Sequence, residues 1–212
     1  MLMPKATEVS HPLIKHHLSR LRDKHTPAAE FRQLVQRLAV LLAYEATKDL
    51  DLRPVEIETP LTRMKGQGLA QRIGLVPILR AGLGMVDPIL NLIPTAEVWH
   101  LGLYRDEETA RPVEYYSKLP QTEPVDVALV VDPMLATGGS AIAALAALSR
   151  WGVRKLKVVS IIASQFGVET IHQQFPTAEI YICAIDPELN SRKFIVPGLG
   201  DAGDRIFNTL RG

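Results

Sequence analysis

Short apolar runs alternate with amphipathic segments along most of the chain. The runs are "IGLVPIL" (73–79), "AEVWHLGL" (96–103), "VDVALVV" (125–131), "KLKVVSIIA" (155–163) and "AEIYICAI" (178–185). Several of them are apolar at consecutive positions, which is typical of strands covered on both faces. Between them lie "GMVDPILNLI", "SAIAALAALSRWG" and "GVETIHQQF", each able to form a crossover helix. The alternation predicts an α/β fold with a doubly wound, mostly parallel sheet and flanking helices.

The first 50 residues predict a helical region. A long amphipathic helix should follow Thr26, the expected N-cap, with Pro27 at the first helical position. Its apolar residues at helical spacing are Phe31, Leu34, Val35, Leu38, Leu41 and Leu42. The preceding stretch "HPLIKHHLSRLRDKH" reads as a shorter basic helix. Its four histidines favour a solvated face over a metal site, because no acidic or cysteine partner stands at ligand spacing: His11, His16, His17 and His25.

One polar segment does not fit the strand–helix alternation. Residues 104–124, "YRDEETARPVEYYSKLPQTEP", show the pattern of an exposed hairpin around Arg111 and Pro112. A loop of this length after a strand is typical of a lid over a site. We therefore expect one domain over residues 1–212, with a helical region at 1–50, a lid at 104–124 and a C-terminal binding segment at 186–212.

Composition and charge narrow the functional classes. The 212 residues include 24 lysines and arginines against 23 aspartates and glutamates, a net charge of +1. This balance argues against a general affinity for nucleic acid or anionic membranes, so any anion site must be local. No apolar run is long enough to span a bilayer, and residues 1–10 lack the apolar core of a secretory signal, which predicts a cytoplasmic protein. The single cysteine, Cys183, is expected to be a buried structural thiol.

The stretch "VVDPMLATGGSA" (130–141) carries the clearest chemical signal. It places Asp132 at the end of a predicted central strand and Thr137, Gly138, Gly139 and Ser140 at the start of the following helix. Unpaired N–H groups at a helix N-terminus attract anions, and glycines let a phosphate approach the backbone. No lysine follows the glycines as a Walker loop requires. The stretch therefore predicts a phosphate cradle beside a carboxylate that could meet sugar hydroxyls.

These residues resemble a known family. "VVDPMLATGGSA" is similar to the 5-phosphoribosyl-1-diphosphate (PRPP) loop of type I phosphoribosyltransferases, and Pro133 after Asp132 is the pattern of the uracil phosphoribosyltransferases. Three further stretches resemble that branch: "VPILRAGLGM" (76–85), "YRDEETARPVEYYSKLP" (104–120) and "FIVPGLGDAGDRIFNT" (194–209). Four separated motifs in the expected order make the resemblance specific.

The resemblance implies transfer of ribose 5-phosphate from PRPP to N1 of uracil, giving UMP and diphosphate. It implies a Mg²⁺ cofactor held mainly by the PRPP diphosphate and water rather than by protein ligands. The residues implied to carry the chemistry are Asp132, Asp201 and Arg105. Those implied to bind PRPP are Arg80, Arg105, Asp132, Pro133, Met134, Leu135, Ala136, Thr137, Gly138, Gly139, Ser140 and Asp201. Those implied to hold uracil are Ile195, Gly200, Asp201 and Ala202.

Two other functions stay open from the residues. Some proteins with this PRPP loop are nucleic-acid-binding regulators of pyrimidine genes, and the segment from Lys15 to Lys24 could form a local basic patch. A phosphoribosyltransferase for another base is the second alternative, although "FIVPGLGDAGD" resembles the uracil-recognition element. The resemblance also suggests a homodimer or larger even homo-oligomer, and GTP as an effector, without identifying residues for either.

Overall fold

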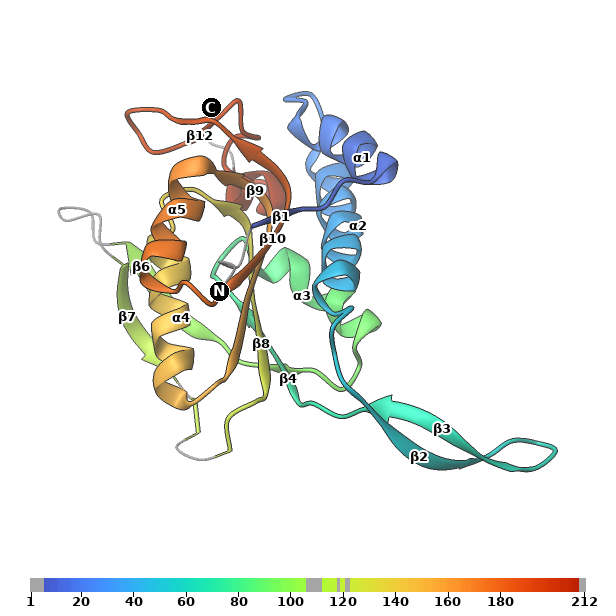
Figure 1. The fold of residues 1–212 in the computed structure, drawn as a ribbon. Coiled ribbons are helices and arrows are strands. Elements are labelled where there is room, and N and C mark those ends of the chain that lie inside the picture. The colour runs from blue at the N-terminus through green and yellow to red at the C-terminus, as the bar shows by residue number, and fades with distance from the viewer. Residues whose placement is uncertain (1–5, 106–111, 118, 121–122, 210–212) are drawn as a thin grey trace.

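A six-stranded parallel sheet forms the centre of the computed structural model, which describes residues 6–105, 112–117, 119–120 and 123–209, with only the backbone at 102–105 and 112–117 (Figure 1). The strand order is β1-β10-β9-β8-β4-β5. The strands are β1 (Thr7–Glu8), β4 (Ile73–Pro77), β5 (Glu97–Val98), β8 (Val127–Leu135), β9 (Lys155–Ser164) and β10 (Glu179–Asp186). All pairings in this sheet are parallel, so the predicted fold class is confirmed.

Helices cover both faces of the sheet (Figure 1). One face packs against α1 (Pro12–Arg22), α2 (Ala28–Ala46), α3 (Leu83–Leu92) and α6 (Ala202–Phe207), and the other against α4 (Gly139–Trp151) and α5 (Gln165–Gln174). Successive residues of a strand point to opposite faces, so Leu129 joins the first core and Val130 the second. Both side chains are fully buried, which explains why the strand is apolar at consecutive positions.

The order of the strands creates a switch point between β4 and β8. From β4 the chain crosses to β5 on one side, whereas from β8 it proceeds through β9 to β10 on the other. Ligands of doubly wound sheets bind beyond the carboxyl ends of the strands at such a point. The fold therefore directs attention to the segments that end β4 and β8.

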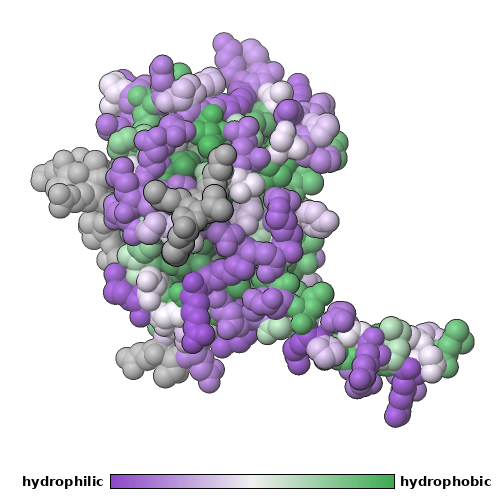
Figure 2. Space-filling model, in the orientation of Figure 1, coloured by the Kyte–Doolittle hydropathy of each residue, from purple (hydrophilic) through white to green (hydrophobic). Residues whose placement is uncertain are grey.

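Within the described part of the chain, three short hairpins lie outside this sheet. β2 (Leu52–Glu58) pairs with β3 (Arg63–Leu69) in an arm that projects away from the sheet (Figures 1 and 2). β6 (Leu101–Arg105) pairs with β7 (Pro112–Ser117), and β11 (Glu188–Leu189) with β12 (Ile195–Val196). The sequence pattern predicted neither the arm nor β11–β12, because their strands carry few buried positions and so lack an apolar alternation.

Several predicted boundaries need correction. The apolar run at 96–103 is two strands: β5 joins the sheet, whereas β6 turns away into the hairpin with β7. The long helix begins at Ala28 with Pro27 as its N-cap, and the Thr26 hydroxyl donates to the Arg20 carbonyl oxygen at 2.6 Å instead of capping α2. The expected turn around Arg111 lies at the edge of residues 106–111, outside the described part of the chain.

The described residues were searched for membrane-spanning helices and for clusters of metal ligands. None of the helices placed there combines the length and apolar character that a membrane span requires. Across the same residues, no three histidine, cysteine, aspartate or glutamate side chains converge on a point that could hold a metal ion. The histidines of α1 accordingly form no such cluster.

Candidate functional site

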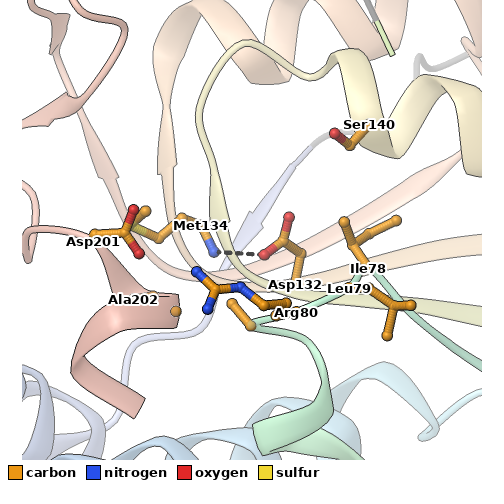
Figure 3. A pocket seen from close by; sticks show the side chains of 10 residues that line it. Ile78, Leu79, Arg80, Asp132, Met134, Ser140, Asp201 and Ala202 are labelled. Carbon is orange, nitrogen blue, oxygen red and sulfur yellow. Dashed lines mark hydrogen bonds between the residues drawn. The ribbon is translucent and has the colours of Figure 1, made fainter. Parts of the chain in front are cut away.

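A pocket of about 310 Å³ opens at the switch point between β4 and β8. Six of the residues predicted to bind substrate line it: Arg80, Asp132, Met134, Ser140, Asp201 and Ala202. Four others complete the wall, namely Ile78, Leu79, Ala81 and Gly203. These four lie within two residues of Arg80 or Asp201 in the sequence, so they could have been predicted as neighbours of those two residues. Figure 3 shows the side chains gathering from three separate segments around the centre of the pocket.

Asp132 lies inside β8 rather than at its end, which corrects the predicted strand boundary. The strand continues to Leu135 because Asp132 stays in register with Ser160 of β9, and Met134 with Ile162. On its other side β4 stops at Pro77, opposite Val131. Residues 132–135 therefore have one strand neighbour and one open side, where the missing N–H of Pro133 costs no ladder hydrogen bond.

The Asp132 carboxyl group is only partly protected by hydrogen bonds. Its Oδ1 accepts from the backbone N–H of Met134 at 3.3 Å, the dashed line in Figure 3. Loss of water contact raises the pKa of Asp132 to about 7, the Met134 bond opposes this rise, and the negative charge of Asp201 adds to it. The carboxylate is thus poised to gain from hydroxyl donors or a cation in the pocket.

The predicted phosphate cradle forms the start of α4. Gly138 is the N-cap, in the left-handed region at φ 82° that favours glycine, and the helix runs for 13 residues from Gly139. No acidic residue stands in its first turn, so nothing there opposes an anion. Ser140 reaches the pocket wall beyond Asp132 (Figure 3). Backbone N–H groups and a helix dipole are therefore available beside the carboxylate.

Helix α5 supports this loop from behind. The Ser164 hydroxyl donates to the Ala136 carbonyl oxygen at 2.5 Å and accepts from the N–H of Gly167 at 2.9 Å. A Cβ on Gly167 would lie 2.4 Å from that same carbonyl oxygen, so the contact requires glycine. Ser164 and Gly167 therefore hold the loop backbone at Ala136.

Arg80 extends along the pocket from the turn after β4. Its Nη2 lies 3.3 Å from Oδ1 of Asp204 in α6, and its side chain is 62% exposed. An exposed ion pair of this length is weak, so the guanidinium can exchange a carboxylate for phosphate oxygens. Figure 3 shows the guanidinium in the region between Asp132 and Asp201. The position suits an anionic group bound in the centre of the pocket.

The C-terminal segment contributes through one aspartate and through its backbone. Asp201 is the N-cap of α6, where its Oδ1 accepts from the N–H of Asp204 at 2.9 Å. Asp201 and Gly200 also line a neighbouring cavity of about 370 Å³. Ile195, by contrast, is 5% exposed and packs in the core, so only its backbone could contact a base.

Not every predicted residue reaches the pocket wall. Leu135 is buried in the core and Pro133 lies in β8, whereas Ala136, Thr137 and Gly138 form the loop and Gly139 begins α4; none of these residues lines this pocket. Gly138 and Gly139 can contribute only through their backbone. The Arg105 side chain lies outside the described residues, although its backbone ends β6. The expected lid role of 104–124 stays a prediction.

Known proteins resemble the chain over nearly its whole length. The family model for uracil phosphoribosyltransferase matches residues 8–209. A Roseiflexus sp. (strain RS-1) protein of that name is 56% identical over 94% of this chain and 96% of its own. Its counterpart in Anoxybacillus flavithermus is 53% identical over 98% of this chain and all of its own.

Solved structures share the fold of this chain. A protein of Aquifex aeolicus superposes with a TM-score of 0.90 and is 39% identical, covering 96% of this chain and 98% of its own. A xanthine-guanine-hypoxanthine phosphoribosyltransferase of Helicobacter pylori matches at a TM-score of 0.50 and 14% identity, over 74% of this chain and 85% of its own, which supports the shared fold alone. With a family model that matches residues 8–209 and relatives of 53–56% identity over nearly the whole chain, the chain belongs to the uracil phosphoribosyltransferase family.

Proposed function

We propose that the protein transfers the 5-phosphoribosyl group of PRPP to N1 of uracil, forming UMP and diphosphate in pyrimidine salvage. One observation carries the chemistry: Asp132 and the start of α4 stand side by side at the switch point, facing Arg80 and Asp201 across one pocket. This arrangement offers acceptors for ribose hydroxyls, donors for a phosphate and a cation for diphosphate. Family membership identifies the base as uracil.

The reaction needs charge stabilisation more than a nucleophile. Breaking the bond from C1 to diphosphate develops positive charge on the ribose and negative charge on the leaving group. Asp132 accepts hydrogen bonds from the ribose hydroxyls, while the N–H groups at 137–140 bind the 5-phosphate. Arg80, released from Asp204, binds the diphosphate with its planar fork. These contacts orient C1 toward N1 of the base, which is worth several kcal/mol when the reacting atoms are aligned.

The two carboxylates of the pocket fit the implied Mg²⁺. Burial, and to a smaller extent the negative charge of Asp201, raises the pKa of Asp132, and a bound dication would favour the ionised carboxylate. Two carboxylates are too few to hold the ion alone, so Asp132 and Asp201 would act with substrate oxygens and water. The ion would neutralise the departing diphosphate. The Asp132 carboxylate, in its ionised form, would accept hydrogen bonds from the ribose hydroxyls.

Base recognition would use the backbone of the C-terminal segment. Main-chain N–H groups near Gly200 and Ala202 can donate to O4 of uracil, and a main-chain carbonyl can accept from N3–H. Cytosine reverses the donor and acceptor at this edge and would leave buried groups without partners. This pattern explains a preference for uracil without a dedicated polar side chain.

The test is product formation with parallel bases. Purified protein with PRPP and Mg²⁺ should convert uracil to UMP with equimolar diphosphate, and should leave cytosine, orotate and hypoxanthine unreacted. Asp201→Asn should reduce turnover at saturating Mg²⁺ because its carboxylate faces the reacting groups. Unchanged turnover in Asp201→Asn would remove Asp201 from the mechanism. Failure of the wild-type protein to form UMP above background would refute the function itself.

A regulator of pyrimidine genes is not favoured. Two cations of the basic α1 segment are already neutralised, since Arg20 pairs with Glu30 and Arg22 with Asp186. Retention on RNA that falls with salt would support that alternative. We also propose a cytoplasmic enzyme that forms an even homo-oligomer and responds to GTP. Size-exclusion chromatography with light scattering and rate measurements with added GTP test these last two points.

A further inference from the structure

The end of α1 contacts the segment that we assign to the base. Arg22, the last residue of α1, donates from Nη1 to Asp186 Oδ2 at 2.7 Å and from Nη2 to Asp186 Oδ1 at 2.6 Å. Asp186 ends β10 and is 4% exposed. The pair therefore joins the N-terminal helical region to the carboxyl ends of the strands, where the substrate pocket opens. The two residues are 164 positions apart in the sequence.

The same two side chains bind both polar groups of Gly198. Arg22 Nη1 donates to the Gly198 carbonyl oxygen at 2.8 Å, and the Gly198 N–H donates to Asp186 Oδ2 at 2.9 Å. Gly198 has φ 62°, and a Cβ there would lie 2.1 Å from the Ile195 carbonyl oxygen. The turn between Ile195 and Gly200 is thus tightly wound, and the ion pair fixes its middle residue.

A second arginine repeats the connection one residue later. Arg205, 8% exposed, donates from Nη1 to the carbonyl oxygens of Leu199 and Leu21, both at 2.8 Å. Its Nη2 donates to the Asp23 carbonyl oxygen at 2.6 Å. Its guanidinium carbon also lies 4.2 Å from the centre of the Phe31 ring. Consecutive carbonyl groups of the turn are therefore held against the C-terminal end of α1.

From these contacts we propose that Arg22, acting with Asp186, is a positioning residue for base recognition. It touches the backbone of the turn, not the reacting atoms, and it sets where Gly200 and Ala202 present their N–H groups. Arg22 and Gly200 also line the same 370 Å³ cavity, so a shift of the arginine would change the shape of this side of the turn. The inference rests on the proposed function and assigns α1 a part in it.

Arginine is required because its fork makes three bonds at once. A lysine keeps the positive charge beside Asp186 but offers no planar pair of donors, so it cannot engage both carboxylate oxygens and the Gly198 carbonyl in this geometry. Arg22→Lys should therefore fold and yet loosen the turn. Because displacements of about 1 Å at a binding site can cost up to about a hundredfold, we expect KM for uracil to rise about tenfold.

The experiment compares Arg22→Lys with Arg20→Lys. Arg20 is an exposed arginine two residues earlier that pairs with Glu30. Initial rates are measured with uracil and PRPP each varied. For Arg22→Lys we expect the rise in KM for uracil, with kcat and KM for PRPP within about threefold of wild type and weaker discrimination against cytosine. Arg22→Met should raise KM for uracil further, so that lysine partly rescues it. Arg20→Lys should match wild type throughout.

Other outcomes separate the two levels of the proposal. Unchanged KM for uracil in folded Arg22→Lys, or equal changes in all three kinetic constants, would overturn the positioning role. PRPP binding, measured by calorimetry, decides the matter if Arg22→Met is poorly active: retained PRPP affinity with lost uracil affinity supports the role, and loss of both refutes it. Failure of the wild-type protein to form UMP would instead refute the proposed function.

Discussion

Asp132→Asn should stabilise the substrate-free protein while impairing it as an enzyme. Burial of the carboxylate raises the pKa of Asp132 from 3.8 to about 7 in the folded protein. Between these pH values the folded state holds a proton that the unfolded chain has released, so the free energy of unfolding falls as pH rises. Asparagine has the same shape and keeps the oxygen that accepts from Met134, but it never carries the charge. The variant therefore escapes this loss.

The magnitude follows from the two pKa values. A rise from 3.8 to about 7 corresponds to about 4 kcal/mol above neutrality. Asp132 is only half-buried, which reduces this figure, so we expect the free energy of unfolding of Asp132→Asn to exceed that of wild type by about 2–4 kcal/mol at pH 8. For a chain of 212 residues this is a rise in Tm of about 5–10 °C. At pH 4 the difference should be small, because the wild-type carboxyl is then protonated in the folded state.

Urea unfolding at several pH values, without PRPP or Mg²⁺, measures this difference. Asp87→Asn, which removes an exposed carboxylate from α3, is the matched control and should show no such pH-dependent gain. The linkage is refuted if Asp132→Asn is no more stable than wild type at pH 8, or if its advantage is the same at pH 4. In parallel, kcat/KM for PRPP should fall in Asp132→Asn because the ribose hydroxyls lose a charged acceptor.

Three other predictions address the diphosphate contact, the phosphate loop and the thiol. Arg80→Ala should lower the rate at low PRPP by about ten- to a hundredfold, because it removes a charge-assisted bond worth about 1.5–3 kcal/mol; an unchanged initial rate would exclude the contact. Gly167→Ala should raise KM for PRPP, since its Cβ would lie 2.4 Å from the Ala136 carbonyl oxygen, and a KM equal to wild type would show that the loop adapts. Cys183, 5% exposed with its pKa raised to about 12 by burial, should resist iodoacetamide in the folded protein and react after unfolding, as mass spectrometry would show; rapid alkylation of the native protein would contradict its burial.

Periodicity predicted the central sheet well because its strands are buried on both faces. Val130 and its neighbours in β8 are apolar at consecutive positions, and a short run of this kind between turn residues is typical of a strand in the middle of a parallel sheet. Periodicity failed for the β2–β3 arm, where most residues are exposed and no core imposes an alternation. It also ended β8 too early at Asp132, because a polar residue and a proline normally stop a strand. Here the early end of β4 leaves that side of β8 open.

The candidate site was likewise predicted only in part from the sequence. Asp132, Ser140 and Asp201 were predicted from local motifs, and the fold brings them to one pocket. The contribution of Arg22 could not be predicted, because its partner Asp186 is 164 residues away and neither residue stands in a recognisable motif. Composition alone assigns Arg22 to a basic surface. Only the three-dimensional structure shows that its charge is used inside the molecule.

Because α5 contacts the loop before α4, the backbone of that loop is ordered during folding and not during ligand binding. Fixing the backbone of one residue costs about 1–2 kcal/mol of conformational entropy, and a mobile loop would incur this cost each time a ligand binds. Here the Ser164 hydroxyl and the close approach of Gly167 hold the Ala136 carbonyl as the chain folds. If the loop binds phosphate as we propose, part of the folding free energy serves its affinity, and α5 contributes through the Ser164 hydrogen bond and the packing of Gly167.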